Sequence, residues 1–124
     1  MGWVIWHKPT CSTSRWVLAA LREAGTRPEI RDYIAAPPSE AELRAVLARL
    51  GMGARGLLRR KGTPFAELGL GDPGLSDDAL IAAMAAHPIL IERPVVMAPQ
   101  GAVLCRPKEA VLDLIARNGA GVAR

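Results

Sequence analysis

The chain has 124 residues, half of them hydrophobic, and a formal net charge of +4. This length and composition predict a packed domain with its own core and exclude a largely disordered chain. The apolar stretches are too short to span a bilayer, and the N-terminal segment fits no secretory signal. The chain has no run of five or more basic residues and only one Tyr and one Phe, so its composition does not favour binding to nucleic acid. We therefore expect a cytoplasmic protein that binds neither a membrane nor nucleic acid.

Hydrophobic spacing predicts a strand, a helix and a second strand in the first part of the chain. Residues 3–6 are aromatic and β-branched and predict a strand that ends before Pro9. Residues 14–24 carry apolar side chains at helical spacing, and Gly25 marks the end of that helix. Residues 29–34 alternate in character and predict the second strand.

The middle of the chain is predicted to be helical. Ser39 and Glu42 have the spacing of a capping box, which starts a helix that runs to about Leu50. Residues 54–60 predict a short helical piece, and Ser76 caps a further helix after a loop rich in glycine.

The last third of the chain predicts a β-hairpin and a closing helix. Strands at residues 95–98 and 102–105 flank the turn Pro-Gln-Gly at residues 99–101. Pro107 suits the first position of the last helix. Residues 118–124 are rich in glycine and alanine and predict a frayed tail.

This order of elements predicts an α/β fold with a mixed β-sheet flanked by helices. A strand-helix-strand start favours a right-handed parallel unit, and the late hairpin adds antiparallel strands to the same sheet. Residues 1–117 then form a single domain, with a helical insertion at about residues 39–90 between the second and third strands.

Cys11 lies where the first predicted strand leads into the first helix, in the segment HKPTCSTSR at residues 7–15. A helix N-terminus presents unpaired N–H groups and a positive dipole end, which bind anions and favour a thiolate over a thiol. Ser12 and Thr13 are short polar residues that suit a bound oxyanion, and a protonated His7 would stabilise the thiolate further. The segment therefore predicts that Cys11 is a nucleophile.

Some of these residues also have structural interpretations. His7, at a strand end, can satisfy a backbone carbonyl, and Ser14 can be the N-cap of the helix. Cys105, the second of two cysteines, lies in the predicted hairpin and is expected to be buried. No C-x-x-C pair is present, and His7 and His87 lack metal-ligand spacing, so a dithiol oxidoreductase and a zinc site are both disfavoured.

Five segments, taken together, resemble the glutaredoxin-dependent arsenate reductase family, also described as ArsC-like. They run in order from about Ile5 to Ile115: HKPTCSTSR, LLRRK at 57–61, ELGL at 67–70, HPILIERPVV at 87–96 and LCRP at 104–107. The resemblance implies a thioredoxin-like fold with a helical insertion. It also implies reduction of arsenate to arsenite with glutathione as co-substrate, glutaredoxin as electron donor and no bound cofactor.

The resemblance further implies roles for single residues. The cysteine that matches Cys11 attacks arsenate and is the only essential thiol. The residues that match His7 and Ser14 assist activation of the thiol. Pro94 matches the cis proline that lies opposite the nucleophile in thioredoxin-like folds.

The resemblance also implies that Arg59, Arg93 and Arg106 bind the oxyanion and the arsenite intermediate. Guanidinium groups bind tetrahedral oxyanions through paired hydrogen bonds and stay charged. From the residues alone, each arginine is better assigned to the protein surface than to a site. Arg106, just before Pro107, would place a cation at the unfavourable end of the last predicted helix, and this conflict favours an anion nearby.

Three other functions are alternatives to this one. A phosphatase-type enzyme needs C-x5-R in one loop, whereas Arg15 follows Cys11 after three residues. A redox regulator of the Spx type, which binds RNA polymerase, uses a C-x-x-C switch that this chain lacks. A thiol oxidoreductase of the ArsC family that acts on a substrate other than arsenate remains the main alternative.

Overall fold

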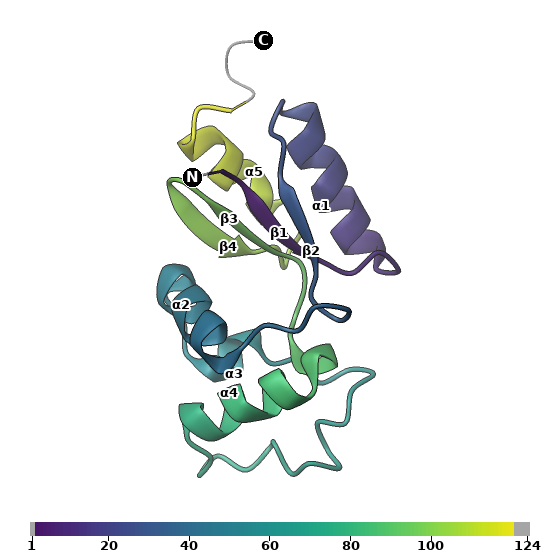
Figure 1. The fold of residues 1–124 in the computed structure, drawn as a ribbon, viewed down its shortest axis with the longest axis vertical. Coiled ribbons are helices and arrows are strands. Elements are labelled where there is room, and N and C mark those ends of the chain that lie inside the picture. The colour runs from purple at the N-terminus through teal and green to yellow at the C-terminus, as the bar shows by residue number, and fades with distance from the viewer. Residues whose placement is uncertain (1, 121–124) are drawn as a thin grey trace. The chain divides into compact units, whose positions relative to one another are not determined.

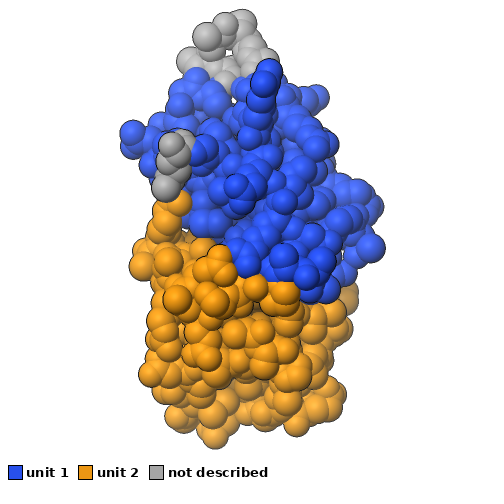
Figure 2. All heavy atoms as spheres, viewed as in Figure 1, with its two compact units in different colours: residues 1–36, 93–124 blue, residues 37–92 orange. Residues whose placement is uncertain are grey.

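The structure, a computed structural model, describes residues 2–120. The chain divides into two compact units, one made of residues 1–36 and 93–124 and the other of residues 37–92 (Figure 2). Each unit has its own elements and buried side chains. The prediction that residues 1–117 form a single domain stays a prediction.

The first unit is built on a four-stranded mixed sheet (Figure 1). Its strands are β1 (Val4–His7), β2 (Glu29–Asp32), β3 (Val95–Ala98) and β4 (Gly101–Leu104). The order across the sheet is β2-β1-β3-β4, with β1 parallel to β2 and β3 antiparallel to both of its neighbours. The predicted mixed sheet, with a parallel start and a late hairpin, is therefore confirmed.

The second strand is shorter than predicted because a turn begins at Asp32. The Oδ1 atom of Asp32 accepts hydrogen bonds from the backbone N–H groups of Ile34 and Ala35, each 3.1 Å long. An aspartate that bonds backbone groups two and three residues ahead favours a turn over an extended strand. The strand predicted at residues 29–34 therefore ends two residues early.

Two helices, α1 (Ser12–Glu23) and α5 (Ala110–Arg117), share one hydrophobic core with the sheet (Figure 1). Both helices bury one apolar side against β1, β3 and each other, and the buried members of this core are Ile5, Val17, Leu18, Leu21, Val96, Ala98, Cys105, Val111, Leu114 and Ile115. Burial of such side chains stabilises the fold by about 1.5–3 kcal/mol each. This core holds the start of α1 in place at the end of β1.

The last helix begins later than predicted. Its N-cap is Glu109, and the segment from Pro107 forms a turn in which the Ala110 N–H donates to the Pro107 carbonyl. The Arg106–Pro107 peptide bond is cis. Pro107 is therefore not the first helical residue, and the expected conflict between Arg106 and the helix dipole was wrong, because the helix starts four residues after Arg106.

The end of α5 is tied to the hairpin by Asn118. Its side chain donates to the Leu114 and Gln100 carbonyls and accepts from the Gln100 N–H. The Ala120 N–H also donates to the Ile115 carbonyl. Residues 118–120 thus complete the helix terminus, and the rest of the predicted tail, residues 121–124, lies outside the described residues.

The second unit is helical, as predicted for the segment between the second and third strands. It contains α2 (Glu40–Leu50), α3 (Ala54–Leu57), α4 (Asp77–Ala86) and the short 3₁₀ helix η1 (Pro88–Leu90). The predicted capping box is present: the Ser39 side chain accepts from the Glu42 N–H, and the Glu42 side chain accepts from the Ser39 N–H. Ser76 caps α4 by accepting from the Ala79 N–H.

The helical piece predicted at residues 54–60 ends early because the chain pairs with a neighbouring extended segment. Leu58 and Ile91 form an antiparallel bridge. The Arg59 N–H donates to the Leu90 carbonyl and the Glu92 N–H donates to the Leu57 carbonyl, each at 2.7 Å. Within residues 2–120, no helix is both long enough and apolar enough to cross a bilayer.

Candidate active site around Cys11

Cys11 is the N-cap residue of α1, in the turn that joins β1 to this helix. Its backbone is extended, with φ −94° and ψ 121°, and its N–H donates to the Lys8 carbonyl at 2.9 Å. The first helical bond follows at once, from the Arg15 N–H to the Cys11 carbonyl at 3.0 Å. The structural interpretation of Ser14 as N-cap was therefore wrong, since Ser14 lies inside the first turn.

The pKa of the Cys11 thiol is lowered by its position. Partial burial alone raises this pKa, but it is outweighed by the Ser14 N–H, the Arg93 guanidinium and the Thr13 N–H, which hydrogen-bond the sulfur, and by the Arg93 charge. These are the two effects that favour a thiolate at a helix start, unpaired N–H groups and nearby cations.

Arg93 and Arg106 both come to the thiol, although they lie far from it in the sequence. The Nη2 atom of Arg106 is 3.7 Å from the Cys11 sulfur, and its Nε donates to the Arg93 carbonyl at 2.8 Å. The Arg93 guanidinium bonds the sulfur. The Arg93–Pro94 peptide bond is cis, and the place of Pro94 opposite the nucleophile stays a prediction.

His7 and Ser14 form a buried link between the end of β1 and the first turn of α1. The Nδ1 atom of His7 lies 2.6 Å from the Ser14 hydroxyl oxygen, which also accepts from the Lys8 N–H at 3.1 Å. Ser14 is fully buried and His7 is 5% exposed. Either neutral tautomer of the imidazole can make this bond, as donor or as acceptor. The link fixes the turn that carries Cys11.

The structure does not support a protonated His7 as an aid to the thiolate. Burial lowers the pKa of His7, Asp32 opposes this effect, and Arg22 and Arg15 lower the pKa further. A lowered pKa keeps the imidazole neutral near pH 7, so it supplies no charge to the sulfur. Arg93, not His7, therefore supplies the positive charge that stabilises the thiolate. That His7 positions the turn around Cys11 stays a proposal.

We predict that the Cys11 thiol titrates below the ordinary cysteine pKa, because the helix start and Arg93 stabilise the thiolate. The rate of iodoacetamide alkylation, measured against pH, follows the thiolate fraction. We expect a midpoint below about 8.5 for the native protein. The same protein in denaturant is the control, and a native midpoint at or above the denatured one would contradict the account.

We predict that Ser14→Ala destabilises the protein by about 1–3 kcal/mol, because it leaves the Lys8 N–H and His7 Nδ1 without their buried partner. Chemical denaturation measures this change. Thr10→Ala is the matched control: its hydroxyl accepts from the exposed Lys8 ammonium in the same turn. Its loss should change stability by less than about 0.5 kcal/mol. An equal loss of stability in the two variants would contradict the claim that the buried bond between His7 and Ser14 stabilises the protein more than an exposed one does.

Arg59 belongs to the second unit, residues 37–92, and its contacts there are well defined. Its Nη1 atom donates to the Glu92 carboxylate at 2.6 Å, and its Nε donates to the Lys61 carbonyl at 3.1 Å. Both side chains of the ion pair are largely buried, with 17% and 21% exposure. Arg59 is therefore not a solvated surface residue, and its part in binding an oxyanion beside Cys11 stays a prediction.

Cys105 is a free, fully buried cysteine in the core of the first unit. Burial raises the pKa of its thiol to about 12, and the nearby Arg106 offsets only part of this effect. A thiol in this state stays protonated and unreactive at neutral pH. Cys105 is thus a packing residue, as the sequence predicted.

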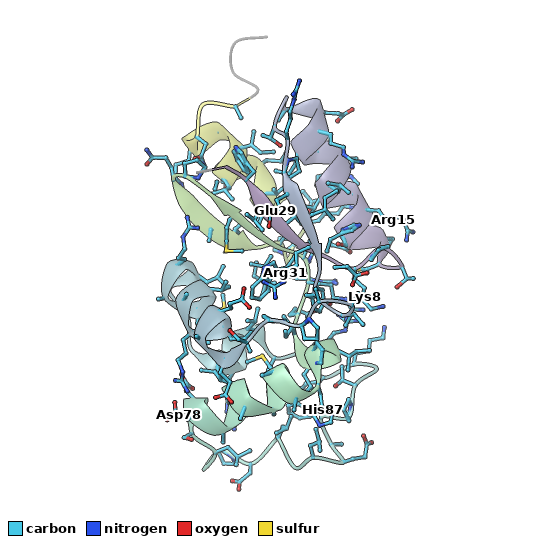
Figure 3. All side chains as sticks on the ribbon, in the orientation of Figure 1. Lys8, Arg15, Glu29, Arg31, Asp78 and His87 are labelled. Atoms are coloured by element: carbon cyan, nitrogen blue, oxygen red, sulfur yellow. The ribbon has the colours of Figure 1, made fainter. Side chains whose placement is uncertain are left out.

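Two residues near the site were missed by sequence reasoning. Lys8 supplies the N–H that anchors Ser14, and Arg15 donates from Nη1 to the Pro9 carbonyl at 2.8 Å (Figure 3). Both contacts tie the turn before Cys11 to the first turn of α1. The role of Lys8 could not be predicted, because no spacing rule identifies a backbone N–H as a hydrogen-bond anchor. Arg15 could have been predicted to lie near Cys11, because it follows Cys11 by four residues at the start of the same helix.

A cavity of about 480 Å³ lies along the outer side of α1, lined by Arg15, Arg22, Leu18, Ala19, Pro9 and His7. The Cys11 sulfur does not line it. Among residues 2–120, no group of three or more His, Cys, Asp or Glu side chains is placed to hold a metal ion.

The mixed four-stranded sheet flanked by helices, with a cysteine at the start of the first helix, is a thioredoxin-like fold. A sequence model of the ArsC family matches residues 6–114. The chain belongs to the ArsC family.

Named relatives agree with this assignment. The chain is 56% identical over 111 residues to an arsenate reductase of Rhizobium meliloti (strain 1021), covering 90% of this chain and 79% of that protein. It is 46% identical over 118 residues to an arsenate reductase of Escherichia coli (strain K12), covering 94% and 84%. The solved structure of an arsenate reductase from Vibrio cholerae matches with a TM-score of 0.86 and 46% identity, covering 91% of this chain and 97% of that one.

Proposed function

We propose that this protein is an arsenate reductase that works through the Cys11 thiolate. The observation that carries the proposal is the meeting of three features at one sulfur: a lowered thiol pKa, the helix N-terminus, and the guanidinium groups of Arg93 and Arg106. A nucleophile that is already surrounded by cations suits an attack on a tetrahedral oxyanion. The relatives named arsenate reductase support the same substrate.

Arsenate carries about two negative charges near neutral pH, and so needs fixed positive partners before a thiolate can approach it. Arg106 is exposed and held by the Arg93 carbonyl, which directs its guanidinium to the sulfur. Arg93 is more buried, where its charge is less screened by solvent. The N–H groups of Thr13 and Ser14, and the short side chains of Ser12 and Thr13, complete a polar surround for the oxyanion.

The proposed reaction has three steps. The Cys11 thiolate attacks arsenic, a sulfur–arsenic bond forms, and an arsenate oxygen leaves as water after taking up protons. A glutathione thiolate then attacks the Cys11 sulfur. The sulfur–arsenic bond breaks and its electron pair stays on arsenic, which is reduced from arsenic(V) to arsenic(III) and leaves as arsenite. The product on the protein is a disulfide between Cys11 and glutathione.

The third step needs a thiol that this chain does not offer near Cys11. Cys105 is fully buried and has a pKa raised to about 12, so it cannot attack the mixed disulfide. We propose that glutaredoxin removes the glutathionyl group and returns Cys11 to the thiolate. Glutathione and glutaredoxin are then the electron donors, and no bound cofactor takes part.

The test is arsenate-dependent NADPH oxidation by the purified protein with glutathione, glutaredoxin and glutathione reductase. We expect turnover that needs arsenate, glutathione and glutaredoxin together, with arsenite as the product. Phosphate in place of arsenate is the control, since it has the same shape and charge but cannot be reduced under these conditions. Absence of arsenate-dependent turnover would contradict the proposed function and favour a family member that acts on another substrate.

A further inference from the structure

Two large apolar side chains are exposed on the two helices of the unit that contains Cys11. Trp16 on α1 is 37% exposed, and Leu112 on α5 is 49% exposed. The Lys108 ammonium, in the turn before α5, lies 5.1 Å from the centre of the Trp16 ring. Lys108 lies in the turn that leads into α5, and Leu112 lies in the first turn of that helix. We call Trp16, Lys108 and Leu112 the Trp16 surface.

Two segments of the chain connect the Trp16 surface to the region of the nucleophile. Trp16 follows Cys11 by five residues on the same helix. Lys108 follows Arg106 by two residues, and the Nη2 atom of Arg106 lies 3.7 Å from the Cys11 sulfur. A molecule that covers Trp16 and Lys108 therefore lies close in the chain to Arg106, whose guanidinium contacts the thiol.

The chemistry of this surface suits a protein more than a small molecule. Its apolar groups stand on the outer sides of two helices, and exposed tryptophan and leucine beside a functional group are typical of an interface. The charged groups that face this region are cations: Arg93 and Arg106 at the thiol, and Lys108 at Trp16. Two further cations, Lys8 and Arg15, lie in the turn and first helical turn around Cys11 in the chain, and Figure 3 labels both. Glu109 is the acidic residue next to Lys108. The complementary partner has an apolar patch and acidic groups beside its own thiol.

We propose that the Trp16 surface is the docking site for the glutaredoxin that regenerates Cys11; this rests on the proposed function. The partner must bring a thiolate in line with the disulfide that joins Cys11 to glutathione. Its thiolate attacks the glutathione sulfur, the disulfide bond breaks, and the electron pair stays on Cys11 as the thiolate. The partner leaves with the glutathionyl group. Contacts at Trp16 and Leu112 hold it in this orientation.

The test starts from protein that carries glutathione on Cys11, made with oxidised glutathione and checked by intact mass, so no arsenate is needed. Regeneration of the thiol is followed with glutaredoxin and, separately, with dithiothreitol. We expect Trp16→Ala combined with Leu112→Ala to lower kcat/KM for glutaredoxin about tenfold or more, which is the loss of an interface contact of about 1.4 kcal/mol. The rate with dithiothreitol should not change.

Ile30→Ala is the matched control. Ile30 is 43% exposed on β2, the edge strand opposite to β4, and α5 packs against β4. It should leave both rates unchanged. Lys108→Glu alone, at a partly exposed position, should also slow glutaredoxin, and it keeps the test valid if the double variant does not fold.

The proposal is overturned if glutaredoxin reduces the double variant or Lys108→Glu as fast as the unmutated protein. It is equally overturned if the dithiothreitol rate falls in parallel, because the substitutions would then act on the disulfide itself. Because this experiment contains no arsenate, a negative result would not contradict the arsenate reductase assignment, which is tested by the NADPH oxidation assay.

Discussion

Cys11→Ser is expected to abolish arsenate-dependent NADPH oxidation, with a loss of at least about 10³-fold. Serine has nearly the same size, but its hydroxyl does not ionise near neutral pH, and the N–H groups of Thr13 and Ser14 cannot lower its pKa far enough. Residual binding of arsenate by Arg93 and Arg106 should survive, since both guanidinium groups remain. The variant thus separates the loss of chemistry from the loss of binding.

Cys105→Ala is the control for the second thiol. Alanine avoids the burial of a hydroxyl in the core, which would cost stability for reasons unrelated to the reaction. Because Cys105 is fully buried and its pKa is raised to about 12, we expect kcat/KM to stay within about twofold of the unmutated protein, after correction for the folded fraction. A loss as large as that of Cys11→Ser would contradict the proposal that one thiol carries the reaction.

Arg93→Ala is expected to lower kcat/KM for arsenate by about 10²-fold and to raise the pKa of the Cys11 thiol. Removal of one fixed donor to a developing oxyanion commonly costs about 10²–10³ in rate. The same guanidinium also bonds the sulfur and stabilises the thiolate, so its loss shifts the alkylation midpoint upward. Both effects follow from one side chain and can be measured on one preparation.

Arg106→Ala separates these two effects. Arg106 lies 3.7 Å from the sulfur but is exposed, so solvent screens its charge and the thiol pKa should move less than in Arg93→Ala. The kcat/KM for arsenate should still fall, because the Arg106 guanidinium can bind an oxyanion oxygen and the variant lacks it. If Arg106→Ala raises the alkylation midpoint more than Arg93→Ala does, the electrostatic account of the site is wrong.

Much of the fold could be predicted because its signals are local. The capping box of Ser39 and Glu42, the cap at Ser76 and the hairpin turn at residues 99–101 each depend on residues a few positions apart. The position of Cys11 at a strand-helix junction could likewise be predicted from nearby residues. The structure confirms these elements with shifts of a few residues at their ends.

The rest depends on contacts between distant segments. The early end of α3 arises from the bridge between Leu58 and Ile91, and the late start of α5 follows a turn in which the Ala110 N–H donates to the Pro107 carbonyl. No periodicity in the sequence shows either feature.

At the site, the sequence left open a charge on His7 that burial disfavours, because the pKa of a side chain depends on neighbours that only the fold brings together. The pairing of β1 with β3 is likewise what brings Arg93 to Cys11. The resemblance to the ArsC family supplied this arginine, which the residues alone would have left on the surface.

The central claim is that Cys11 alone receives the glutathione during arsenate reduction. The most direct measurement is peptide mass mapping after one turnover with arsenate and glutathione, without glutaredoxin. The account predicts one glutathionyl group on the peptide that contains Cys11, formed only when arsenate is present, and none on the peptide that contains Cys105. Glutathione on Cys105, or modification of Cys11 by reduced glutathione in the absence of arsenate, would contradict it.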